Sequence, residues 1–147
     1  MRTYNHLDDI EAYEPWSYVR ATKTVVPDDC NVASNEYQLN ALSKSQIMGS
    51  LFWLGRLFVF ASSDFANYAS ITAINDFAFG TMPDAGETFQ IKVKVDKRDW
   101  GNVVLDADVA SANRFIARGS FSLATLELND SDIIDRLTAL WNSRTVW

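Results

Sequence analysis

The stretch from Ile47 to Ala61 limits most strongly what this chain can fold into. It is 15 residues long and apolar apart from two glycines, Ser50 and one charge, Arg56. A transmembrane helix needs about 20 apolar residues without a central charge, so we expect a helix enclosed by protein. Ser43 and Gln46 have the spacing of a capping box, which places the helix over 44–61.

The rest of the sequence reads as an antiparallel sheet. From Phe89 to Asp96, apolar and polar residues alternate with the period of a half-buried strand. We expect strands over 16–26, 68–79, 89–95, 102–110 and 114–128, the last four as a meander, and a C-terminal helix over 131–142. Strands segregated around one helix predict an α+β fold, as a single domain over 1–147 with its core over about 16–128.

Composition removes several classes of function. The 147 residues carry a net charge of -6, which argues against nucleic acid or an anionic membrane as partner. There is one cysteine, Cys30, and one histidine, His6. We therefore expect no disulfide framework, metal site or cofactor. The first residues lead into no apolar segment, which predicts a cytoplasmic protein. We expect His6 to be an exposed tail residue and Cys30 a buried thiol without catalytic role.

Two segments resemble a known enzyme family. Residues 18–25 read YVRATKTV, and residues 73–79 read AINDFAF, followed by PDAGE at 83–87. Over about 16–128 the chain is similar to the hot-dog 3-hydroxyacyl-acyl-carrier-protein dehydratases of the FabZ and FabA type. The resemblance implies a hot-dog fold, a dimer, and a substrate carried on the phosphopantetheine of an acyl carrier protein or CoA in fatty-acid or polyketide biosynthesis.

The residues that carry the family's chemistry are missing. The resemblance implies a His in the loop before the helix and a Glu or Asp fourteen residues later, inside the helix. The register set by Arg20 and Lys23 places Asn35 at the His position and Gly49 at the acid position. The register set by Asn75 places Gln46 at the acid position. An amide does not abstract a proton near neutral pH, so the dehydratase mechanism lacks its groups.

Three interpretations stay open. The first is a degenerate, noncatalytic dehydratase-like subunit in a heterodimer with a competent hot-dog partner, with an acyl carrier protein as further partner. The second is an acyl-CoA or acyl-carrier-protein thioesterase, or a divergent dehydratase, that uses other residues. The third is a noncatalytic module that binds acyl thioesters.

The candidate site residues each have a structural alternative. Glu36 is the best-placed carboxylate for a base or nucleophile, although it also fits a solvated loop. Asn35 fits a turn, and Gln46 fits the capping box. The candidate lining of an acyl tunnel consists of Gly49, Phe52, Trp53 and Arg56.

Charged residues raise two further expectations. Arg56 needs a partner in its apolar helix, and we favour Asp76 slightly over a ligand. A basic strip could bind a phosphopantetheine arm or an acidic carrier protein, or form only the wet face of a strand. The strip consists of Lys92, Lys94, Lys97 and Arg98.

Overall fold

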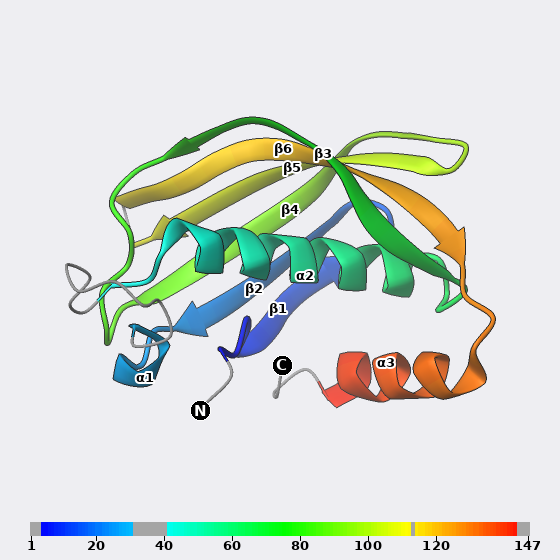
Figure 1. Ribbon diagram of the computed structural model, residues 1–147, viewed down its shortest axis with the longest axis horizontal. Helices are drawn as coiled ribbons and strands as arrows, with labels where there is room; N and C mark the ends of the chain where they lie inside the picture. Colours follow the sequence, from blue (N-terminus) through cyan, green and yellow to red (C-terminus); the bar gives the residue numbers. More distant parts are fainter. Residues whose placement is uncertain (1–3, 31–40, 113, 144–147) are drawn as a thin grey trace.

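The computed structural model describes residues 4–30, 41–112 and 114–143, in which one helix lies across one face of a curved sheet (Figure 1). The six strands pair in the order β1-β2-β4-β5-β6-β3, all antiparallel. Their bounds are β1 Asp9–Glu14, β2 Tyr18–Thr24, β3 Asn67–Phe79, β4 Thr88–Asp99, β5 Asn102–Ser111 and β6 Arg114–Glu127. The helices are α1 Pro27–Cys30, α2 Lys44–Ser62 and α3 Ser131–Ser143.

The start of the sheet differs from the expectation. The strand expected over 16–26 is present as β2, but an additional strand, β1, precedes it and pairs with it as a hairpin, and the short helix α1 begins at Pro27. Trp16 lies in the turn with a φ of 55°. Polar and apolar residues alternate only from Asp9 to Ala12 before Tyr13 breaks the pattern, so the signal of β1 is too short to predict a strand.

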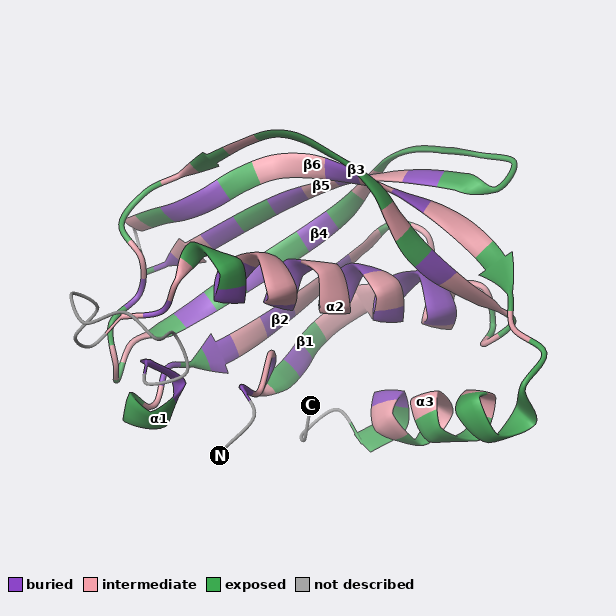
Figure 2. Cartoon of the chain, viewed as in Figure 1, coloured by how far each residue is buried: buried purple, intermediate pink, exposed green. Residues whose placement is uncertain are grey.

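The expected four-strand meander is correct only for β4, β5 and β6. The other side of β4 is occupied by β2, so β3 pairs with β6 at the far edge of the sheet. Figure 2 shows β3 largely exposed, and Ile74 on this strand keeps 53% of its surface exposed. Thus β3 is a 13-residue edge strand with a free side.

The predicted central helix is confirmed, as is its capping box. Ser43 Oγ accepts from the Gln46 backbone N–H at 3.2 Å, and Gln46 Oε1 accepts from the Ser43 N–H at 2.9 Å. The helix packs closely on the sheet at Gly55, where an added Cβ would lie 2.8 Å from the Phe121 ring. The core contains Leu51, Leu54 and Phe58, all fully buried.

The C-terminal helix is also confirmed. Its one buried residue among those described, Trp141, packs edge-on against Tyr13 of β1 with ring centroids 4.8 Å apart. In the part of the chain that the structure describes, no helix is long and apolar enough to cross a membrane.

Candidate functional site

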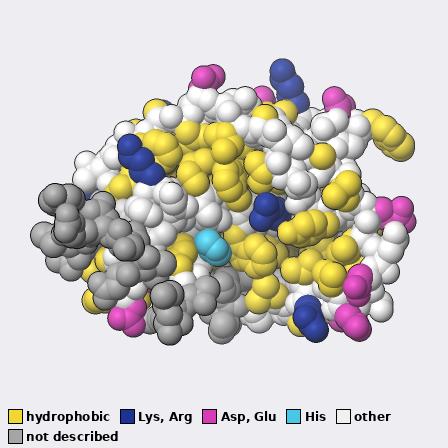
Figure 3. All heavy atoms as spheres, viewed as in Figure 1, with side chains coloured by type: hydrophobic (Ala, Val, Ile, Leu, Met, Phe, Trp, Pro, Cys, Tyr) yellow, Lys and Arg dark blue, Asp and Glu magenta, His cyan; other side chains and the backbone are white. Residues whose placement is uncertain are grey.

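The side of α2 that faces away from the sheet is lined by half-buried residues. Gly49, Trp53 and Arg56 are separated by four and three residues, so they lie along one side of the helix. Met48 and Phe52 flank them. Figure 3 shows the chain's single histidine, in cyan, at the surface among hydrophobic side chains on this face.

Residues 4–8, the N-terminal segment, are fixed against α2 by buried polar contacts. The Tyr4 hydroxyl lies 3.0 Å from Ser50 Oγ, and Ser50 Oγ in turn lies 2.9 Å from the backbone carbonyl oxygen of His6, to which it donates. Since Ser50 follows Gly49, these contacts attach the segment directly beside that glycine.

The His6 ring contacts the backbone of α2 at Gly49. A Cβ at position 49 would lie only 2.9 Å from His6 Cε1, so any larger residue here would displace the imidazole. The ring stands edge-on to Tyr4, with centroids 5.0 Å apart, and is tilted against Trp53 at 6.5 Å. The expectation that His6 is an exposed tail residue is therefore wrong.

The environment of His6 favours its neutral form. Burial lowers the pKa of the imidazole from 6.5, and the charge of Lys23 lowers it further. His6 Nδ1 is buried and has no hydrogen-bond partner. A neutral imidazole has one unprotonated ring nitrogen, and where that nitrogen is accessible it can accept a proton from water or a substrate.

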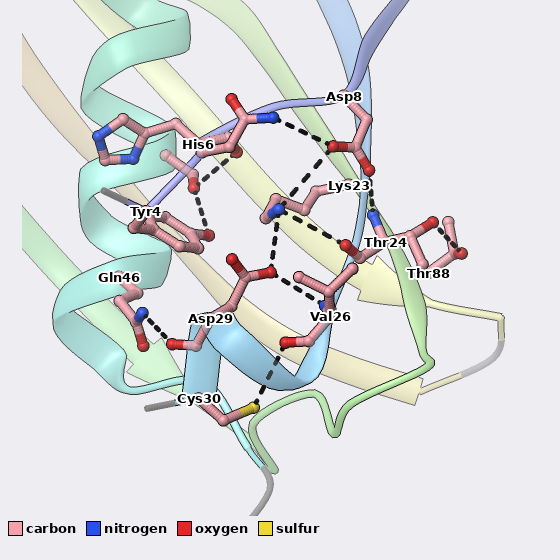
Figure 4. A network of polar contacts seen from close by, with 12 residues as sticks. Tyr4, His6, Asp8, Lys23, Thr24, Val26, Asp29, Cys30, Gln46 and Thr88 are labelled. Atoms are coloured by element: carbon pink, nitrogen blue, oxygen red, sulfur yellow. Dashed lines mark hydrogen bonds and ion pairs between the residues drawn. The ribbon is translucent and has the colours of Figure 1, made fainter. Parts of the chain in front are cut away.

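A buried ion pair holds the N-terminal segment, β2 and α1 together (Figure 4). Lys23 Nζ lies 3.2 Å from Asp29 Oδ2, and these side chains are 2% and 1% exposed. It also lies 3.8 Å from Asp8 Oδ1 and 5.2 Å from the centre of the Tyr4 ring. Asp8 accepts from the Thr24 backbone N–H at 2.6 Å. The segment that carries His6 is thus anchored at both ends.

Three buried polar atoms on this face lack hydrogen-bond partners. They are His6 Nδ1, Trp53 Nε1 and Arg56 Nε. Buried polar groups are nearly always paired in folded proteins, so three unpaired atoms on one face single it out as a candidate site. The indole Nε1 and the guanidinium Nε carry hydrogens and can only donate.

The structure places the predicted site residues as follows. Asn35 and Glu36 lie outside the described residues. Both ends of the Gln46 amide are used structurally, because Nε2 donates to the Asp29 carbonyl at 2.7 Å and Oε1 completes the capping box. The four residues assigned to the tunnel come together on the outward side of α2, where Phe52 also packs edge-on against Phe121 at 5.4 Å.

Cys30 is buried, as expected, and no metal site forms around it. Its Sγ lies 4.0 Å from the Val26 carbonyl oxygen, and burial raises the pKa of the thiol. A thiol with a raised pKa is a poor nucleophile near neutral pH. Among the described residues, no three His, Cys, Asp or Glu side chains gather as metal ligands.

Two expectations about charges fail. Arg56 makes no ion pair with Asp76, which instead lines a groove of about 460 Å³ on the sheet. Lys92 and Lys94 line the same groove, opposite Asp108 and Asp106 of β5. Because each of these lysines faces an acid across the strand pair, they form no free basic strip.

The other two cations of the strip lie apart from this groove. After a register shift between Val95 and Lys97, the Arg98 guanidinium stacks on the Trp16 ring at 4.0 Å. Because of this register shift, Lys97 and Arg98 do not continue the alternation of exposed and buried residues that places Lys92 and Lys94 on one face of β4.

A sheet curved around one long helix is the hot-dog fold, and comparison with solved structures agrees. The chain is similar to the smu.793 protein of Streptococcus mutans bound to acetyl-CoA, with a TM-score of 0.70 and 16% identity over 88% of this chain and 96% of that one. It is similar to a hot-dog-like protein of Thermanaerovibrio acidaminovorans, with a TM-score of 0.67 and 14% identity over 89% and 93%.

A third similar structure is a hypothetical thioesterase of Streptococcus pneumoniae with coenzyme A, with a TM-score of 0.65 and 15% identity over 83% and 88% of the two chains. No family model matches the sequence, and no curated protein is significantly similar to it. The hot-dog fold is confirmed. The finer resemblance to dehydratases gains no support from these structures, one of which is described as a thioesterase.

Proposed function

We propose that this protein binds acyl thioesters of coenzyme A and hydrolyses them, with His6 as the general base. The observation that carries the proposal is the half-buried His6 ring, the chain's single imidazole, packed against Gly49 on the outward side of α2. In the dehydratase register, Gly49 stands where an acid is expected, so His6 supplies a titratable group at a position where the helix itself has none. The thioester ligand class is further supported by two similar structures that hold acetyl-CoA and coenzyme A.

The chemistry follows from a base that acts on water. His6 takes a proton from a water molecule while the water oxygen attacks the thioester carbonyl carbon. The tetrahedral intermediate then collapses, the C–S bond breaks, and the protonated imidazole returns the proton to the leaving thiolate. The products are a carboxylic acid and free coenzyme A. General-base catalysis of this kind contributes about 10²- to 10⁴-fold to rates.

The test compares the two candidate bases. His6→Gln keeps a polar side chain but removes the base, and we expect at least about a hundredfold loss of kcat/KM for acyl-CoA hydrolysis, measured by thiol release. Glu36→Gln is the matched variant for the competing carboxylate, and we expect it to retain activity. Loss of activity in Glu36→Gln alone would transfer the role of base to Glu36. Binding of acyl-CoA without turnover by the wild type would favour the noncatalytic module.

We propose further that the functional unit is a homodimer joined through the free edge of β3. A long edge strand with unpaired backbone groups is a template for pairing with another strand. The exposed Ile74 on that strand supplies apolar surface for such a contact. A homodimer with His6 in each copy needs no separate competent partner.

A further inference from the structure

The outward side of α2 contains an unpaired cation in apolar surroundings. Within the described part of the chain, Arg56 forms no ion pair, and its Nε is buried without a hydrogen-bond partner. Its helix neighbours on the same side are Phe52 and Trp53. A partly buried guanidinium is stabilised by a bidentate anion, and carboxylate matches its geometry.

A second donor lies one helical turn away. Trp53 Nε1 is also buried without a partner, and its residue precedes Arg56 by three positions. An indole N–H can only donate, so Trp53 supplies no acceptor and no negative charge that could pair with Arg56. One positive charge on an apolar wall complements an acyl chain that ends in a carboxylate.

The spacing along α2 sets the length of that chain. Arg56 follows Gly49, which contacts His6, by seven residues, or about 10 Å at 1.5 Å per residue. Long helical side chains lean toward the N-terminus, which brings the guanidinium back toward His6. A thioester carbonyl at His6 and a carboxylate at Arg56 are therefore separated by a short acyl chain.

We propose that Arg56 selects acyl thioesters whose acyl group carries a terminal carboxylate, the monothioesters of short dicarboxylic acids. Arg56 pairs with the carboxylate, while the thioester lies at His6. This inference rests on the proposed function for the placement of the thioester.

The experiment measures binding apart from turnover. Non-hydrolysable thioether analogues of succinyl-CoA and butyryl-CoA have the same chain length and differ in the terminal carboxylate. We expect the wild-type protein to bind the succinyl analogue at least about tenfold more tightly by isothermal titration calorimetry, and Arg56→Met to bind both equally. Arg136→Met, which removes an exposed cation from α3, is the matched control and should keep the preference.

The results separate this inference from the proposed hydrolysis. Equal affinity of the wild type for both analogues, or a preference that survives Arg56→Met, would overturn the selection by Arg56. A preference that depends on Arg56, in a protein that hydrolyses neither thioester, would uphold the selection and refute the hydrolase. A uniform loss of turnover on both substrates in Arg56→Met, without any change in relative binding, would assign Arg56 to the reacting carbonyl instead.

Discussion

At the residue scale, His6 and Gly49 are in contact. A substitution at Gly49 should therefore change the hydrolytic activity without lowering the stability of the fold. In Gly49→Ala the new methyl group would lie 2.9 Å from His6 Cε1, so the imidazole has to move. Alanine also raises helix propensity by up to about 1 kcal/mol. We expect at least about a tenfold loss of hydrolytic activity with an unfolding temperature that is unchanged or higher.

The control for this variant is Ser45→Ala, which improves helix propensity at an exposed position of the same helix. It should retain full activity. If Gly49→Ala is as active as Ser45→Ala in a thiol-release assay, the contact between His6 and α2 has no part in catalysis.

The lowered pKa of His6 predicts the pH dependence of both activity and stability. Activity needs the neutral imidazole, so kcat/KM should be constant near neutral pH and fall at a pH below the ordinary 6.5. Between 6.5 and the lowered pKa the unfolded chain binds more protons than the folded one, so stability should also decrease as the pH falls. His6→Gln should lack this contribution to stability, as measured by denaturant unfolding between pH 7 and 5. An identical pH dependence in both proteins would contradict the burial of His6.

At the scale of elements, the buried ion pair should be essential to the junction of β2, α1 and the N-terminal segment. Lys23→Met leaves Asp29 buried without its cation, and breaking a buried pair in this way costs about 3–5 kcal/mol. We expect the double variant Lys23→Met, Asp29→Asn to recover part of that loss, because no unpaired charge is then buried. The measurement is the free energy of unfolding in urea.

The control is the exposed pair formed by Arg20 and Glu11, whose side chains are 39% and 33% exposed. Arg20→Met should cost no more than about 1 kcal/mol. If Lys23→Met is equally mild, the ion pair does not hold these elements together.

The elements that the sequence predicts well are those whose signals are local. The period of β4 and the capping box of α2 depend on residues within one turn or strand, and both are confirmed. The placement of β3 beside β6 depends on which edge of the sheet is free, and nothing in the β3 sequence encodes that. The site is hardest to predict, because His6 meets Gly49 across 43 residues, and a contact between residues so far apart in the sequence leaves no local pattern.

At the scale of the whole molecule, the free edge of β3 predicts a homodimer. Ile74→Lys places a charge on the exposed edge and should convert the dimer to monomer, as measured by size-exclusion chromatography with light scattering. Ile133→Lys is the matched control, because Ile133 is 42% exposed on α3, away from this edge. A monomeric wild type, or a dimer that Ile74→Lys leaves intact, would refute the edge-to-edge assembly.

Because Trp53 lies close to His6, the fluorescence of Trp53 should report the protonation of the His6 imidazole. Their rings lie 6.5 Å apart, and a protonated imidazole quenches the fluorescence of a nearby indole. The chain has five tryptophans, among them the fully exposed Trp100. Subtracting the emission of Trp53→Phe from that of the wild type therefore leaves the emission of Trp53 alone. Its intensity against pH would record the titration of a single imidazole without substrate, isotope label or assay.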